Sequence, residues 1–122
     1  MNGVDFLADT NVLLYLLSGN PVVSDFLDSR LAISEITMLE LLGVKDITAE
    51  RLQIRQALVK NTRLVYLNDE IRSLTISLRQ QCKVKLPDAL IAATAQWLQV
   101  PLLTADRDFA KLPRLQLLLI QP

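Results

Sequence analysis

Short apolar runs alternate along the chain with longer amphipathic segments. Short runs of this kind, bounded by polar or turn-forming residues, are typical of strands buried in a sheet. The runs that predict strands span residues 4–8, 31–33, 63–67, 102–104 and 115–120.

The longer segments carry the spacing and the end signals of helices. After Asn68, apolar residues recur at steps of three and four positions, which places them on one helix face. Ser34, Thr48 and Asn68 can each cap the helix that follows, and Pro87 fits a first helical turn. The predicted helices span residues 10–17, 21–29, 35–44, 48–60, 69–82 and 87–98, with a short helical turn at 106–111.

Strands that alternate with helices predict an α/β protein, a three-layer α/β/α sandwich around a central, mostly parallel sheet. With 122 residues, the chain has the length of one domain, so we expect residues 1–122 to form a single unit. Functional groups gather beyond the carboxyl ends of strands in such sheets. That rule singles out Asp9, Ser34 and residues 104–106.

Composition narrows the class of protein. Hydrophobic residues make up 51% of the chain and charged residues 21%, which excludes an intrinsically disordered segment. The one cysteine, Cys82, cannot form an internal disulfide, and residues 1–5 lack the basic start of a signal peptide. No apolar run approaches the roughly 18 residues of a membrane-spanning helix. We therefore expect a cytoplasmic protein without membrane association.

The charges are balanced in total but not in distribution. Thirteen basic and thirteen acidic residues give a formal net charge of zero, while residues 1–50 sum to −6 and residues 51–122 to +6. Such a division fits a basic, phosphate-facing surface beside an acidic metal site. It fits equally well a set of solvated helix faces.

Two carboxylates stand in apolar surroundings. Asp9 follows a predicted buried strand and is either a helix cap or a functional group. Glu40 lies on an apolar helix, where Ser34, Thr37 and Glu40 recur every three residues and form a narrow polar seam. A buried carboxylate there needs a partner, a metal or a proton, unless it faces solvent.

Further acids begin predicted helices. Asp88 directly follows Pro87, and Asp106 and Asp108 follow the strand at 102–104, so each also has an alternative interpretation as a capping acid. Together, oxygen-only clusters without His suit Mg²⁺ or Mn²⁺ better than zinc. Carboxylates that hold Mg²⁺, with no Ser–His pair in the chain, indicate metal-activated water attacking a phosphodiester.

Four blocks of sequence carry a family resemblance. They are residues 7–11 (LADTN), 34–42 (SEITMLELL), 86–95 (LPDALIAATA) and 102–109 (LLTADRDF). In this order the blocks resemble a PIN-domain ribonuclease, most closely the VapC-like toxins of type II toxin–antitoxin modules. The resemblance runs from Val4 to about Leu118.

The resemblance implies an endoribonuclease that depends on Mg²⁺ or Mn²⁺. Asp9, Glu40 and Asp88 would be the three core metal-site acids. Asp106 would be the fourth, with Asp108 as an alternative or helper. The residues that would orient these ligands or metal-bound waters are Thr10, Asn11 and Thr104.

The resemblance also implies partners. Arg79, Lys83, Lys85 and Arg107 stand close to the acidic blocks and are interpreted either as contacts to RNA phosphates or as ordinary solvated residues. VapC-like toxins pair with an antitoxin and form homodimers. The leucine-rich residues 12–17 and 26–27 are candidates for such a surface, and equally for the core.

Two other hypotheses remain at this stage. One is a receiver-like phosphoacceptor domain, in which Asp69 would accept the phosphoryl group. Its weakness is that Asp9 lacks an adjacent acid and no Lys follows the last strand. The other is a PIN-like binding module whose site is inactive.

Overall fold

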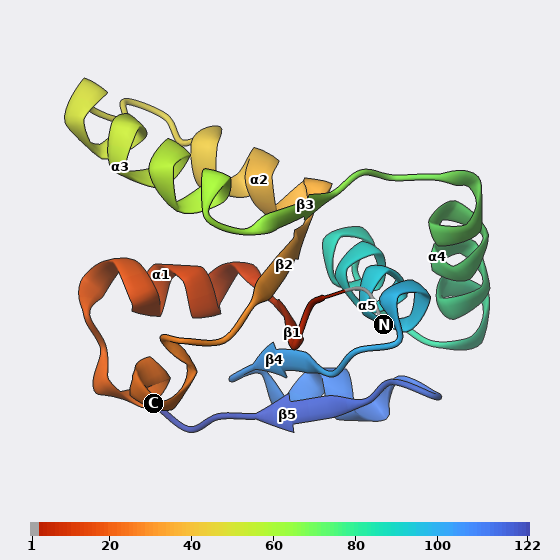
Figure 1. Cartoon of the computed structure of the whole chain (residues 1–122). Helices are drawn as coiled ribbons and strands as arrows, with labels where there is room; N and C mark the ends of the chain where they lie inside the picture. Colours follow the sequence, from red (N-terminus) through yellow and green to blue (C-terminus); the bar gives the residue numbers. More distant parts are fainter. Residues whose placement is uncertain (1–2) are drawn as a thin grey trace.

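The computed structural model describes residues 3–122. Its strands are β1 (Phe6–Ala8), β2 (Leu31–Ser34), β3 (Arg63–Val65), β4 (Leu102–Thr104) and β5 (Leu117–Leu119). They form one sheet in the order β3-β2-β1-β4-β5, and each neighbouring pair is parallel (Figure 1). The sheet is therefore parallel throughout, and all five predicted strands are present.

The helices follow the predicted segments closely. They are α1 (Thr10–Ser18), α2 (Glu35–Leu42), α3 (Ala49–Lys60), α4 (Asp69–Gln81) and α5 (Leu86–Leu98), with 3₁₀ helices η1 (Pro21–Phe26) and η2 (Arg107–Lys111). Asn68 accepts a hydrogen bond from the backbone N–H of Ile71, and Thr48 caps α3 in the same way through Arg51. Three of the predicted caps, at Ser34, Thr48 and Asn68, are confirmed.

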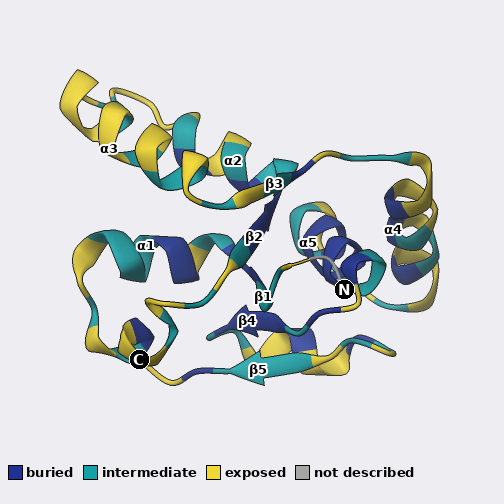
Figure 2. Cartoon of the chain, viewed as in Figure 1, coloured by how far each residue is buried: buried dark blue, intermediate teal, exposed yellow. Residues whose placement is uncertain are grey.

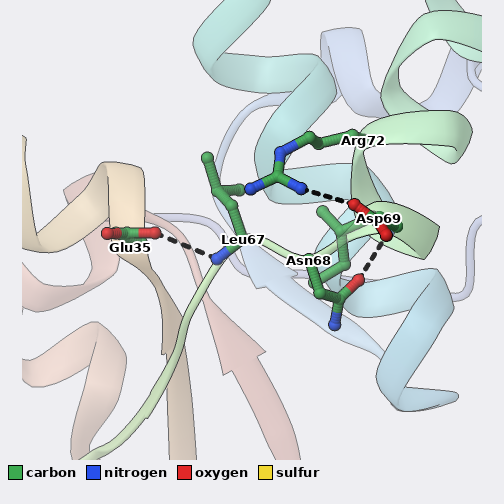
Figure 3. Close-up of polar contacts among 6 residues, drawn as sticks. Glu35, Leu67, Asn68, Asp69 and Arg72 are labelled. Carbon is green, nitrogen blue, oxygen red and sulfur yellow. Dashed lines mark hydrogen bonds and ion pairs between the residues drawn. The ribbon is translucent and has the colours of Figure 1, made fainter.

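Several predicted elements are shorter than expected, including β1, β5 and α2, and two of them have a local explanation. The helix predicted at 21–29 is a 3₁₀ helix that ends at Phe26, because β-branched Val22 and Val23 and the following Ser24 have low α-helix propensity. The strand predicted at 63–67 ends at Val65. The backbone N–H of Leu67 donates to Oε1 of Glu35 at 2.9 Å, so a side chain on α2 takes the place of a neighbouring strand (Figure 3).

The sheet separates two apolar cores. Successive strand residues point to opposite faces, so Leu7 and Leu102 contribute to one core, and Ala8 and Leu103 to the other. Helices α4 and α5 cover the first face, while α1, α2 and η1 pack on the second. Figure 2 shows α5 as the most deeply buried helix and α3 as the most exposed. This arrangement confirms the three-layer sandwich.

Small residues on α5 allow it to lie close to the sheet. Ala89, Ala92, Ala93 and Ala95 are all fully buried. On the other face, Val12 and Leu13 of α1 are buried in the core, whereas Leu27 is 66% exposed. Most of the candidate surface at 12–17 therefore belongs to the core. No helix within residues 3–122 has the length and apolar character needed to cross a membrane.

Candidate active site

Asp9 lies where two central strands end. Because β1 and β4 are paired with Ala8 opposite Leu103, the residues that follow these positions meet at the same edge of the sheet. The Thr104 hydroxyl donates a hydrogen bond to Oδ2 of Asp9. Oδ1 of Asp9 accepts from the backbone N–H of Val12 at 2.9 Å and so caps α1. Asp9 is 5% exposed, and a hydrogen bond to each of its two carboxylate oxygens holds the side chain in place.

The same threonine hydroxyl connects Asp9 to Asp106. The backbone N–H of Asp106 donates to Oγ1 of Thr104 at 3.0 Å. Oδ1 of Asp106 then accepts from the backbone N–H of Asp108 at 2.9 Å, which begins η2. Asp106 is half-buried and Asp108 is exposed, so the two acids of this block lie in different surroundings.

Glu40 reaches this edge from α2, and it is exposed rather than buried. Its Oε1 accepts a hydrogen bond from the Thr10 hydroxyl at 2.7 Å, and the fully buried Thr37 hydroxyl lies 3.2 Å from Thr10 Oγ1. Of the two interpretations left open for Glu40, the solvent-facing one is therefore correct, and Glu40 occupies the outer end of the polar seam. Ser34, at the inner end, caps α2 through the backbone N–H of Ile36.

Asp88 stands in the first turn of α5 and is half-buried. Within the described chain, its carboxylate accepts no hydrogen bond. Burial raises the pKa of Asp88, and the negative charges of Asp106, Glu40 and Asp108 raise it further, while Lys85 opposes them. Acids from three segments of the chain therefore act on one another electrostatically.

Asp9 belongs to the same electrostatic cluster. Burial is the main cause that raises its pKa, and the charges of Asp106 and Asp88 add to it. The hydrogen bonds from Thr104 and Val12 act in the opposite direction. The charge of Asp106 therefore raises the pKa of both Asp9 and Asp88, whereas the charge of Asp108 raises only the pKa of Asp88.

The donor set fits a hard divalent cation in its chemistry. The cluster offers carboxylate oxygens, and the unpaired carboxylate of Asp88 lies in a field of like charges that a cation would offset. Among residues 3–122, however, no three acidic, His or Cys side chains lie close enough to hold one ion directly. Mg²⁺ keeps several of its waters, so a site with fewer direct ligands still suits it.

A pocket of about 490 Å³ is lined both by acids of this cluster and by basic residues. Its charged lining consists of Arg79, Lys83, Lys85, Lys111, Asp88, Asp106 and Asp108. Three of the four predicted phosphate contacts thus lie at the pocket, and Arg107 is exposed outside its lining. Sequence reasoning missed Lys111. Its position three residues after Asp108 on a 3₁₀ turn, where side chains three apart align, was the available signal.

Two other predicted residues make no hydrogen bond to these acids within residues 3–122. Asn11 is exposed, and its side chain makes no hydrogen bond to the acids within residues 3–122. Asp69 follows the edge strand β3 and pairs with Nη1 of Arg72 at 2.8 Å (Figure 3). The proposed phosphoacceptor therefore follows an edge strand, not a middle one, and lines no part of the pocket.

A comparison with protein families identifies the fold. A family profile described as "PIN domain" matches residues 6–115, a range that contains all four sequence blocks. The chain belongs to the PIN-domain family. The predicted resemblance is thereby confirmed, and the receiver-like hypothesis is wrong. No curated protein sequence matches the chain.

Solved structures show the same fold. The PIN domain is 34% identical to a chain of a toxin–antitoxin complex from Klebsiella pneumoniae, with 89% of this chain and 93% of that chain covered and a TM-score of 0.77. A chain of the DNA-bound VapBC complex from Salmonella typhimurium is 20% identical, with 94% and 97% covered and a TM-score of 0.84. A chain of VapBC-1 from nontypeable Haemophilus influenzae is 22% identical, with 93% and 96% covered and a TM-score of 0.80.

Proposed function

We propose that this PIN domain is an endoribonuclease that depends on Mg²⁺ or Mn²⁺ and acts as the toxin of a toxin–antitoxin pair. The observation that supports the proposal is that β1 and β4 end side by side, so that hydrogen bonds through Thr104 connect Asp9 with Asp106 and Thr10 connects Glu40 with the start of α1. The charges of Glu40 and Asp106 also act on Asp88. Asp88 and Asp106 also line a pocket that contains four basic residues.

Asp9, Glu40 and Asp88 would hold the cation, with Asp106 as the fourth acid. When bound, the cation supplies an acidified water for attack on phosphorus and neutralises charge on the phosphate. Asp106 suits this role better than Asp108, since its charge acts on both Asp9 and Asp88 and it is half-buried. Asp108 would act as a helper.

The hydroxyl groups of the site hold its acids in place. Thr104 bonds to Asp9 and accepts from the backbone of Asp106, so it fixes the spacing of two acids. The Thr10 hydroxyl donates a hydrogen bond to Glu40 and so holds that carboxylate in place. The pocket lysines and Arg79 offer positive charge for RNA phosphates, which predicts that binding weakens as salt increases.

The similar structures support one of the proposed partners. The structure that is 34% identical is a toxin–antitoxin complex, and this likeness supports an antitoxin as the partner of this chain. We further propose that residues 1–122 act as one PIN-like domain, that the toxin works in the cytoplasm, and that it forms a homodimer.

Cleavage of RNA by the purified chain tests the proposal. Wild type should cleave in Mg²⁺ and stop in EDTA. Asp9→Asn, Glu40→Gln and Asp88→Asn should each lower the rate about 100-fold or more, because each removes several kcal/mol of charge stabilisation. Asp28→Asn is the matched control, since this exposed acid lies three residues before β2 begins, at the opposite edge of the sheet.

Circular dichroism of each variant would show that it is folded. The proposal would be contradicted if the three site variants cleaved RNA as fast as the control Asp28→Asn. Cleavage that persists in EDTA would also contradict it. Absence of cleavage by a folded wild-type chain would favour the alternative of a PIN-like binding module with an inactive site.

A further inference from the structure

A second concave site lies at the edge of the sheet where β4 and β5 begin. This groove, of about 580 Å³, is walled by α4, the end of α5 and the residues that precede β5. The backbone N–H of Leu102 donates to the carbonyl oxygen of Gln116 at 2.8 Å, which joins the starts of the two strands. In Figure 1, β4 and β5 begin on the side of the molecule where α4 lies. The groove is therefore at the opposite end of these strands from the acids.

The described residues that line the groove all differ from those that line the pocket beside the acids. Its volume lies within the range of roughly 300–1,000 Å³ found for small-molecule sites. The groove is thus a separate candidate binding site, large enough for a small molecule.

The groove combines an apolar floor with a rim of amides. Leu78, Ala95 and Val100 are buried and form the floor. The rim carries the side chains of Gln81, Gln96, Gln99 and Gln116. A glutamine amide both donates and accepts hydrogen bonds. Such a site can cover a flat, apolar body and bond to the polar atoms along its edge.

Two rim residues adopt a backbone conformation that favours glycine. Gln99 has a φ of 59° and Arg114 a φ of 58°, and within residues 3–122 the only other non-glycine residue with a positive φ is Asp46. Gln99 ends α5, at a position where glycine is the usual residue. The chain thus keeps two long polar side chains where glycine would be less strained. Strained residues of this kind gather at ligand sites, and both of these line the same groove.

Arg114 is the one charged residue among the described residues that line the groove. It is exposed, and the ion pairs within residues 3–122 join Arg30 to Asp5 and Arg72 to Asp69. The Arg114 guanidinium therefore has no acidic partner in the described chain, and it offers a bidentate site for a phosphate or a carboxylate.

The lining excludes several classes of ligand. A ligand with an amino group would find no acid to pair with, and a chain of many phosphates would find a single cation. A fatty acyl chain would cover the rim amides without bonding to them, which is unfavourable. The lining instead fits a ligand with one anionic group and a flat body that carries both donors and acceptors.

Two hydrogen bonds order the rim. Nε2 of Gln96 donates to the carbonyl oxygen of Pro113 at 2.9 Å, so it holds the turn that carries Arg114 against α5. Nε2 of Gln81 donates to Oγ of Ser77 at 3.0 Å. In the part of the chain that the structure describes, Oε1 of neither glutamine accepts a hydrogen bond. A purine edge presents donors next to acceptors, and a glutamine amide can pair with both at once.

We propose that this groove binds a purine nucleoside monophosphate, with the purine on the apolar floor, the rim amides at its edge and the phosphate on Arg114. The inference goes beyond the proposed nuclease function. Binding requires neither the acids nor a divalent cation, so the two sites can be tested independently.

Titration of the full chain with adenosine 5′-monophosphate in EDTA tests the groove. The ligand should shift the NMR methyl signals of Leu78 and Val100. It should bind at least about tenfold more tightly than adenosine, which lacks the phosphate, and at least about tenfold more tightly than inorganic phosphate, which lacks the purine. Succinate, an anion without a ring, serves as a further comparison and should bind as weakly as phosphate.

Two variants at one position separate binding from folding. Arg114→Gln should weaken binding of the monophosphate about tenfold and change binding of adenosine less than twofold, because it removes only the partner of the phosphate. Arg114→Gly should have the same effect on binding and should unfold at the same temperature as wild type or a higher one, since glycine adopts this φ without strain. The matched control is Arg51→Gln, at an exposed arginine of α3 outside the groove, and it should bind as wild type does.

Four results would overturn the inference. They are monophosphate binding no tighter than phosphate binding, succinate binding as tight as monophosphate binding, unchanged binding by both Arg114 variants, and loss of binding in Asp88→Asn. The last result would place the ligand at the acids. Conversely, absence of RNA cleavage by a chain that binds the monophosphate normally would contradict the nuclease and leave the groove intact.

Discussion

The inner and outer parts of the acidic site are built differently. Asp9, in the inner part, is buried, caps α1 and accepts the Thr104 hydroxyl, so the fold itself holds it. Asp88, in the outer part, is half-buried and accepts no hydrogen bond within residues 3–122, and its neighbours are mainly other acids. Burial raises the pKa of both acids, but only at Asp9 do hydrogen bonds, from Thr104 and Val12, offset part of that cost. The outer acid therefore carries a cost to stability that a bound cation would reduce.

The largest expected difference concerns stability. Asp9→Ala should lower the free energy of unfolding by about 1–2 kcal/mol, because the change removes a helix cap and a buried hydrogen-bond partner. Asp88→Asn should leave that free energy unchanged or raise it, since it removes a charge from a cluster of like charges. Urea denaturation in EDTA measures the free energy of unfolding of both variants. Equal destabilisation by Asp9→Ala and Asp88→Asn would contradict the difference between the inner and the outer acid.

The second expected effect is the stabilisation of the fold by Mg²⁺, which should depend on Asp88. At a Mg²⁺ concentration tenfold above its dissociation constant, wild type should gain about 1.4 kcal/mol in free energy of unfolding. Asp88→Asn should lose most of this gain, whereas Asp28→Asn should keep it. Thermal denaturation with and without Mg²⁺ provides the measurement, and a full Mg²⁺ response in Asp88→Asn would exclude that carboxylate from the cation site.

The pH dependence of stability should be smaller and should have a defined sign. Because the pKa of Asp88 is raised above 3.8 in the folded state, the folded chain binds the proton more tightly than the unfolded chain. In EDTA, this group should therefore lower stability as the pH rises from about 3.8 through the raised pKa. The free energy of unfolding of Asp88→Asn, measured by urea denaturation at each pH, is subtracted from that of wild type to isolate the effect. A difference that rises with pH would contradict the expectation.

The smallest effect is expected at the buried threonine behind Glu40. Thr37→Val removes the hydroxyl that contacts Thr10, so Glu40 should be held less firmly. We expect the Mn²⁺ concentration for half-maximal cleavage to rise about threefold with little change in the maximal rate. Thr37→Ser should restore it, and the same rise in both variants would indicate a packing defect instead.

The sequence was most informative where local chemistry decides the outcome. Asn68 and Thr48 mark helix starts because their side chains cap the backbone, and the apolar runs at 31–33 and 102–104 mark strands because both faces of the sheet are covered. The sequence left open whether Glu40 is buried or faces solvent, since apolar neighbours along one helix do not show which side faces the sheet. The end of β3 depends on Glu35, which is distant in sequence.

The candidate site was predicted only in part, because contacts between residues distant in sequence also decide which side chains line it. Asp9 and the segment around Asp106 stand after strands, so the rule for parallel sheets places them at one edge. Lys111 joins the pocket through the turn of η2, and Arg107 falls outside it although it stands between two site acids. Neighbourhood in the sequence was a poor guide to which cations line the pocket.

The position of Mn²⁺ in crystals of the full chain tests the central claim most directly. Anomalous scattering locates the ion without reference to activity. The account predicts a peak at the carboxyl edge of β1 and β4, bound by Asp9 and Asp88 directly or through water. A peak bound elsewhere, or none at a Mn²⁺ concentration that supports cleavage, would contradict it.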